Sequence, residues 1–176
     1  MSLDNALAKA APIVLMGFDV DGVLTDGTLY FTSQGDEMKA FSSLDGHGIK
    51  MLGEAGIKLA IITGRKSKAV ELRAANLGID ILLQGVENKR EAMAALLAQH
   101  GLDFSQAGYM GDDVVDLPVL QACGFSASVA DGHPLVQERV AYVASKGGGK
   151  GAVREVCELI LRAQYKLDTV LAKWLR

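Results

Sequence analysis

The stretch "GFDVDGVLTDG", residues 17–27, directly follows the apolar run "IVLM" and carries three carboxylates within eight positions, Asp19, Asp21 and Asp26. An apolar run that ends in a glycine-containing turn is typical of a buried strand. Carboxylates gathered at the end of such a strand repel one another and lose hydration unless a cation or hydrogen bonds compensate. A single Asp after a strand usually caps a turn, so the grouping, more than any one residue, indicates a functional loop.

Short apolar segments alternate with segments of helical period along the rest of the chain. The predicted strands cover residues 13–18, 58–63, 80–84, 107–111, 125–129 and 141–144. The predicted helices cover residues 46–55, 67–76, 88–100, 116–122 and 150–165. Continuous apolar strands that alternate with helices are typical of a parallel sheet covered on both faces. The sequence therefore predicts a doubly wound, Rossmann-like α/β fold, in which ligands bind at the carboxyl ends of the strands.

Residues 28–41 interrupt this alternation. The segment "TLYFTSQGDEMKAF" has short alternating apolar stretches on either side of a Ser-Gln-Gly-Asp turn, which predicts a β-hairpin inserted after the first strand. A lone hairpin is marginal in water, so we expect Leu29, Phe31, Met38 and Phe41 to pack on the parent domain or on a neighbouring subunit, with the subunit favoured.

Length and composition limit the other classes. The 176 residues, 49% of them hydrophobic, predict one domain, residues 1–176, that ends in a helix and tail at 150–176. No apolar run approaches the roughly 20 residues of a bilayer span, and the start lacks a signal-peptide pattern, so we expect a cytoplasmic protein without a membrane partner. Cys123 and Cys157 lack metal-site spacing and are expected to be buried thiols.

The net charge of −3 is unevenly distributed. Residues 138–176 hold eight Lys and Arg against four Asp and Glu, which makes the C-terminal part the basic end. Aromatic residues make up 6% and do not interleave with the basic ones, so nucleic acid is not an expected partner. The glycine-rich stretch 147–151 departs from the nucleotide-binding pattern and is predicted to be a mobile loop.

Polar residues gather at one edge of the predicted sheet, where three strands end and the helix at 88–100 begins. They are Asp19 and Asp21; Thr63, Gly64 and Arg65; Lys89; and Asp112, Asp113 and Asp116. Carboxylate ligands without His or Cys favour Mg²⁺, which binds phosphate oxygens in its remaining positions. A hydroxyl, the backbone N–H groups of a glycine turn and an ammonium around that ion would cradle a phosphate. The ordered set therefore predicts a Mg²⁺-dependent phosphate site.

The same set resembles the four motifs of the haloacid dehalogenase superfamily of phosphotransferases: "DVDGVLT" (residues 19–25), "TGR" (63–65), Lys89 and "GDDVVD" (111–116). The resemblance implies that Asp19 attacks phosphorus and that Asp21 serves as acid and then as base. It implies Mg²⁺ on the Asp19 and Asp112 carboxylates and the Asp21 carbonyl. It further implies that Thr63 and Lys89 hold phosphoryl oxygens, while Asp113 and Asp116 support the metal and Lys89.

Superfamily members usually carry a cap domain, either after the first motif or between the second and the third. This chain has no room for one, because only the hairpin and a helix separate Asp26 from Thr63, and 25 residues separate Thr63 from Lys89. The stretches "DGHGI" (45–49), "VADGHPLV" (129–136) and "GGGKGAVREVCELIL" (147–161) resemble the capless phosphatases of 3-deoxy-D-manno-octulosonate (Kdo) 8-phosphate. That resemblance implies a homotetramer built through the hairpin. Because this substrate is a sugar acid, Arg65 and Lys150 are candidates for its anionic groups.

Other functions remain open on the sequence. A phosphatase for a nine-carbon, sialic-type sugar acid 9-phosphate would recognise the same carboxylate and terminal phosphate. A receiver-like signalling domain also gathers an acidic cluster, a Thr and a Lys, although in another motif order. A catalytically reduced assembly module is the third alternative, and the complete set of acidic residues, Thr63 and Lys89 argues against it.

Overall fold

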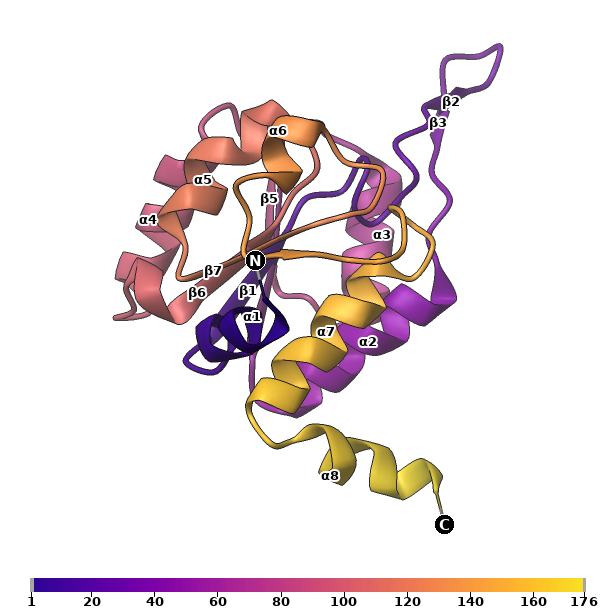
Figure 1. Ribbon diagram of the computed structural model, residues 1–176. Coiled ribbons are helices and arrows are strands. Elements are labelled where there is room, and N and C mark those ends of the chain that lie inside the picture. Colours follow the sequence, from indigo (N-terminus) through magenta and orange to yellow (C-terminus); the bar gives the residue numbers. More distant parts are fainter. Residues whose placement is uncertain (1, 176) are drawn as a thin grey trace.

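The computed structural model of the chain describes residues 2–175, which form a six-stranded parallel sheet between two layers of helices (Figure 1). The strands are β1 (Leu15–Phe18), β4 (Lys58–Thr63), β5 (Ile81–Gln84), β6 (Ala107–Met110), β7 (Phe125–Ser128) and β8 (Tyr142–Val143). Their order is β5-β4-β1-β6-β7-β8. The predicted doubly wound α/β fold is confirmed, and each of the six predicted strands is present.

The helices divide between the two faces of the sheet according to where their apolar side chains are buried. One face is covered by α1 (Leu3–Ala10), α2 (Ser43–Glu54), α3 (Lys68–Leu77) and α7 (Ala152–Ala163). The other is covered by α4 (Lys89–Gln99), α5 (Leu117–Ala122) and the short α6 (Pro134–Gln137), which the sequence analysis did not predict. The winding changes direction between β1 and β6, the position at which doubly wound folds bind ligands.

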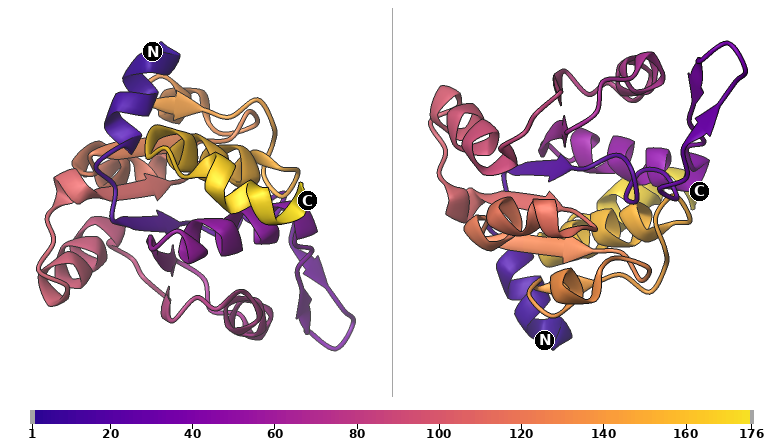
Figure 2. Two further views of the ribbon diagram at one scale, coloured as in Figure 1. Left: turned by 90° about the horizontal axis from the view of Figure 1, so that it is seen from below. Right: turned by 90° about the horizontal axis from the view of Figure 1, so that it is seen from above.

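The predicted hairpin is present as β2 (Tyr30–Phe31) and β3 (Glu37–Met38), and it projects from the body of the protein (Figures 1 and 2). Phe41, at its base, packs against the hydrophobic core. The side chains of Leu29, Phe31 and Met38 are 41%, 59% and 57% exposed in the single chain. The hairpin thus leaves most of its apolar surface uncovered by its own domain.

The chain ends in α8 (Leu167–Leu171) and a 3₁₀ turn (Ala172–Trp174), which lie against α2. Lys166 donates to the carbonyl of Ala55 at 3.0 Å, Lys173 pairs with Glu54 at 2.5 Å, and the rings of Trp174 and His47 lie 5.5 Å apart. The tail therefore docks on its own domain. Within residues 2–175, no helix has the length and apolar character to cross a bilayer.

The glycine-rich loop, for which mobility was predicted, is closely packed in the structure. The backbone of residues 147–151 packs directly on the acidic loop, where Gly149 donates to the carbonyl of Val23 at 3.0 Å. A Cβ at Gly148 would overlap the carbonyl oxygens of Gly22 and Thr25. Because only glycine permits this approach, the segment is a packed wall behind the acidic loop.

Candidate active site

β1 and the loop after it place Asp19 and Asp21 at the centre of the sheet edge. β1 lies between β4 and β6, and the Asp19 N–H continues the ladder by donating to the Met110 carbonyl at 3.0 Å. Gly22 then turns the chain with a φ of +91°, and a Cβ there would overlap the Asp112 carboxylate. The glycine of "DVDG" is therefore needed both for the turn and for the close approach of Asp112.

The loop after β6 is organised around Asp116, which is fully buried. One of its carboxylate oxygens accepts from the N–H groups of Asp112 and Asp113 at 3.1 and 3.3 Å. The Asp113 side chain is exposed and accepts from the Val114 N–H at 2.7 Å, so it caps the short 3₁₀ turn at 114–116. Asp113 and Asp116 thus fix the backbone that presents Asp112, which agrees with the supporting role implied by the resemblance.

Lys89 begins α4, directly after the N-cap residue Asn88, and only 6% of it is exposed. Its Nζ lies 2.9 Å from Oδ1 of Asp19 and 2.5 Å from Oδ1 of Asp116. Burial lowers the pKa of this ammonium, but the two carboxylates outweigh burial and hold the pKa above its ordinary value. Lys89 therefore stays protonated and ties the first motif to the fourth.

Thr63 ends β4, is 2% exposed, and is followed by the Gly64–Arg65 turn. These residues line a cavity of about 250 Å³ together with residues of the loop after β1 and of α4. It is lined by Asp19, Asp21, Thr63, Gly64, Arg65, Val86, Glu87, Lys89 and Val115. Six of the predicted site residues, from three motifs, therefore share one cavity, as the topology of the sheet predicts.

Carboxylate oxygens of Asp19, Asp112 and Asp116 lie within 4.8 Å of one another. Burial, followed by the charge of Asp116, raises the pKa of Asp19 to about 6. Burial, followed by the charges of Asp19 and Asp116, raises the pKa of Asp112 to about 7. In both cases the single positive charge of Lys89 is insufficient compensation. A divalent cation would supply the missing charge, and all-oxygen donors suit Mg²⁺.

The structure does not bring Lys150 to this cavity. Its side chain is 64% exposed, and its Nζ lies 4.0 Å from a carboxylate oxygen of Asp131. Asp26 is also outside the cavity, where its carboxylate accepts from the Thr28 N–H at 2.9 Å and shapes the turn. Lys150 was proposed as a partner for the anionic groups of the sugar acid, and its charge alone does not determine where its side chain points.

Two residues that the sequence analysis did not select, Glu37 and Lys39, reach the site from the hairpin. The Nζ of Lys39 bonds to Oδ1 of Asp21 and lies 3.1 Å from Oε1 of Glu37. The other Glu37 oxygen lies 2.5 Å from Arg65. The alternation of a strand places positions 37 and 39 on one face, and this period of two was the only signal that could have linked them.

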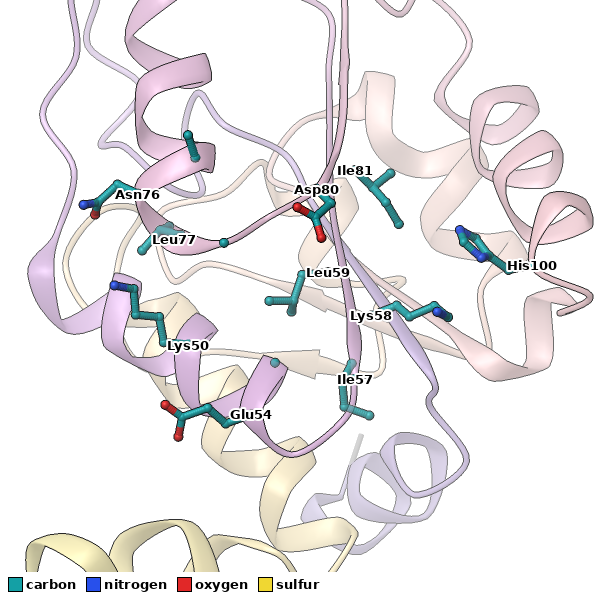
Figure 3. Close-up of a pocket in the computed structure, with 13 residues that line it drawn as sticks. Lys50, Glu54, Ile57, Lys58, Leu59, Asn76, Leu77, Asp80, Ile81 and His100 are labelled. Atoms are coloured by element: carbon teal, nitrogen blue, oxygen red, sulfur yellow. The ribbon is translucent and has the colours of Figure 1, made fainter.

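A second cavity, of about 620 Å³, lies at the opposite edge of the sheet, where β4 begins at Lys58 and β5 begins at Ile81 (Figure 3). Its charged or titratable groups are Lys50, Glu54, Lys58, Asp80 and His100. None of the predicted site residues lines this cavity. Its larger volume does not make it the active site, because the converging acidic, hydroxyl and ammonium groups all lie at the carboxyl edge.

Comparison with known proteins agrees with this geometry. The family of haloacid dehalogenase-like hydrolases matches residues 78–155. The chain is 49% identical, over 93% of its length and 87% of the relative's, to 3-deoxy-D-manno-octulosonate 8-phosphate phosphatase KdsC of Escherichia coli strain K12. A crystal structure of a probable YrbI family phosphatase from Pseudomonas syringae is 46% identical, with a TM-score of 0.97 and 98% of both chains covered.

A further solved structure, 43% identical, is the 3-deoxy-D-manno-octulosonate 8-phosphate phosphatase of Moraxella catarrhalis in complex with a magnesium ion, a phosphate ion and Kdo. It has a TM-score of 0.96 and covers 98% of this chain and 99% of its own. The fold and the site define a capless hydrolase of the haloacid dehalogenase-like class. Within that class, the chain belongs to the family of 3-deoxy-D-manno-octulosonate 8-phosphate phosphatases.

Proposed function

We propose that this chain hydrolyses Kdo 8-phosphate to Kdo and inorganic phosphate, a step in the synthesis of lipopolysaccharide precursors. The observation that carries the proposal is the convergence of Asp19, Asp21, Thr63 and Lys89 on one cavity, in a chain of this family. Arg65 lines the same cavity with a half-exposed guanidinium, which can meet the carboxylate of a sugar acid.

In the first step, an Asp19 oxygen forms a bond to phosphorus while the bond from phosphorus to the sugar oxygen breaks. Asp21 donates its proton to the departing alkoxide, which leaves as the sugar hydroxyl. In the second step, Asp21 takes a proton from water, and the water oxygen bonds to phosphorus as the aspartyl-phosphate bond breaks. Asp19 is restored, and phosphate leaves. Thr63 and the Lys89 ammonium stabilise the charge on the phosphoryl oxygens throughout.

The Asp19 and Asp112 carboxylates and the Asp21 carbonyl would hold Mg²⁺. Asp116 is better suited to a supporting role, because its oxygens already accept from Lys89 and from two backbone N–H groups. When bound, Mg²⁺ neutralises the carboxylates and draws negative charge from the phosphoryl oxygens. The raised pKa values of Asp19 and Asp112 agree with such a site, because burial and then the neighbouring carboxylates disfavour their charged forms, which a bound cation would favour.

The pH dependence of stability should therefore depend on metal. The pKa values of Asp19 and Asp112 in the folded state, about 6 and about 7, lie above the ordinary 3.8. Between pH 3.8 and these values, the folded state therefore binds more protons than the unfolded state. In EDTA, stability from these groups is lost as the pH rises toward about 8, with a fall of several degrees in Tm. Mg²⁺ should raise Tm more at about pH 8 than at about pH 5.5, because it competes with protons.

Thermal scans of wild-type protein and Asp112→Asn, with EDTA and with Mg²⁺, check this expectation. The Asn variant should show a flatter pH dependence in EDTA and a smaller Mg²⁺ effect, because it lacks one of the titrating ligands. A wild-type Tm that rose with pH in EDTA relative to the variant would contradict the placement of the charge at this cluster.

Phosphate release from Kdo 8-phosphate, N-acetylneuraminate 9-phosphate and glucose 6-phosphate, each with Mg²⁺ and with EDTA, tests the proposed substrate. We expect a strong preference for Kdo 8-phosphate and loss of turnover in EDTA. Equal, slow turnover of all three would contradict the proposed substrate but would still support the proposed phosphatase reaction. If the chain hydrolysed none of the three substrates, the proposed phosphatase activity would be wrong.

We further propose a homotetramer assembled through the hairpin. The support is the apolar surface that Leu29, Tyr30, Phe31 and Met38 present to solvent, since a two-stranded hairpin does not hold such a surface alone. Burial in a subunit interface would remove this area from water. We also propose a cytoplasmic location, with which the two buried free thiols, Cys123 and Cys157, agree.

Replacing Phe31 and Met38 together by Ser should reduce the particle to a smaller species by light scattering, because both side chains are more than half exposed on the hairpin. Substitution is cleaner than deletion, which would also remove Lys39 from the site. Leu72→Ser, at a residue 63% exposed on α3, is the matched control and should not change the size. An unchanged particle with the double substitution would remove the hairpin from the interface.

A further inference from the structure

Four charged side chains form a closed ring of alternating sign beside the active-site cavity. Lys39 bonds to Oδ1 of Asp21, while the Nε of Arg65 lies 3.6 Å from Oδ2 of the same carboxylate. Glu37 closes the ring, 3.1 Å from Lys39 and 2.5 Å from Arg65. The ring joins three separate segments: the acidic loop, the turn after β4 and the hairpin.

The two cations of the ring differ in burial. The Lys39 side chain is 1% exposed, whereas that of Arg65 is 46% exposed and lines the cavity. Lys39 does not line the cavity, so it does not meet the substrate directly. A buried ammonium is costly unless anions surround it, and Asp21 and Glu37 supply them. Arg65 holds the pKa of Glu37 down to about 2, so Glu37 stays ionised and Lys39 keeps both partners.

Asp21 has two competing cations, and they favour different orientations of its carboxylate. Lys39 bonds directly to one oxygen, whereas Arg65 is at 3.6 Å from the other, beyond ordinary hydrogen-bond length. Without Lys39, the nearest remaining cation is the half-exposed Arg65, which would draw the carboxylate to itself. An acid must lie within hydrogen-bond reach of the leaving oxygen, so a turned carboxylate would protonate that oxygen poorly.

We infer that Lys39 is a positioning residue, which holds the Asp21 carboxylate in the orientation that protonates the departing sugar oxygen. This inference rests on the proposed function. It also makes the hairpin part of the active site of its own subunit, since Glu37 and Lys39 both come from that hairpin.

The dependence of rate on the leaving group tests this role. Kdo 8-phosphate has an alkoxide leaving group that needs a proton, whereas p-nitrophenolate leaves without one. In Lys39→Met, kcat/KM for Kdo 8-phosphate should fall by about tenfold or more, while kcat/KM for p-nitrophenyl phosphate should change by less than about threefold. Lys39→Arg, which retains the charge, should restore most of the lost rate.

Lys68→Met removes a lysine whose side chain is 77% exposed on α3 and should leave both rates unchanged. Light scattering and circular dichroism on each variant separate a positioning effect from a change in assembly or fold. If the Met variant failed to fold, Lys39→Ala, which also lacks a donor for Asp21, would carry the same comparison.

Equal losses on the two substrates, or no loss on either, would overturn the role of Lys39. A wild-type chain that hydrolysed p-nitrophenyl phosphate but not Kdo 8-phosphate would instead contradict the proposed substrate. The Lys39 comparison would then be made with whichever alkyl phosphate the wild-type chain does hydrolyse, so the two failures remain distinct.

Discussion

Asp19→Asn should abolish phosphate release while leaving the fold intact. The Asn side chain has the same shape and can still accept from Lys89, which lies 2.9 Å from the carboxylate in the native chain. It lacks the anionic oxygen that attacks phosphorus, so the covalent step has no nucleophile. We expect turnover to fall on the order of 10⁴-fold or more, as when nucleophiles are removed from other covalent enzymes.

Asp26→Asn is the matched control, because it makes the same chemical change seven positions along the same loop. The Asp26 carboxylate accepts only from the turn at Thr28, and an amide oxygen can do the same. This variant should keep its activity with Kdo 8-phosphate and Mg²⁺. Appreciable phosphate release by Asp19→Asn, or a comparable loss of activity in both variants, would contradict the role of Asp19 as the nucleophile.

The sequence was sufficient to predict the framework of the active site because the rule that governs it is topological. Parallel strands end at one edge, so Asp19, Thr63 and Asp112 meet there although almost 100 positions of sequence separate the first from the last. The residue types then define the chemistry, because oxygen donors beside an ammonium suit a metal and a phosphate. The four motifs were therefore found without any knowledge of side-chain contacts.

Contacts set by the packing of irregular segments could not be predicted in this way. Asp45 illustrates the point: its carboxylate accepts from the N–H groups of Gly151 and Arg154 and so caps α7, more than 100 positions along the chain. Lys39 belongs to the same category, since the angle at which the hairpin leaves the domain decides whether it reaches Asp21. No periodic pattern encodes that angle.

The glycine-rich loop shows a second kind of contact that the sequence pattern does not predict. Glycines permit mobility, and they also permit close backbone packing; composition alone does not distinguish the two. Here the packing dominates, because Gly148 lies against the acidic loop, where a side chain would not fit. The same packing turns Lys150 outward, to Asp131, and away from the cavity.

Lys89→Met should remove both activity and much of the stability of the metal-free protein. The Lys89 ammonium is the only cation in direct contact with Asp19 or Asp116 among the ion pairs of residues 2–175. Its loss leaves the fully buried Asp116 with backbone donors alone. Removing one partner of a buried ion pair costs about 3–5 kcal/mol, and losing one stabilising charge in the transition state lowers the rate by about 10²–10³.

A second substitution separates these two consequences. Asp116→Asn in the Lys89→Met background removes the charge that was left unpaired, so thermal unfolding in EDTA should return part of the way toward wild type. Phosphate release should not return, because the ammonium that holds the phosphoryl oxygens is still missing. Arg90→Met removes an exposed neighbouring charge on α4 and should affect neither property. Recovery of activity in the double variant would show that Lys89 serves the fold alone, and an unaltered melting temperature in Lys89→Met would show that Asp116 does not depend on it.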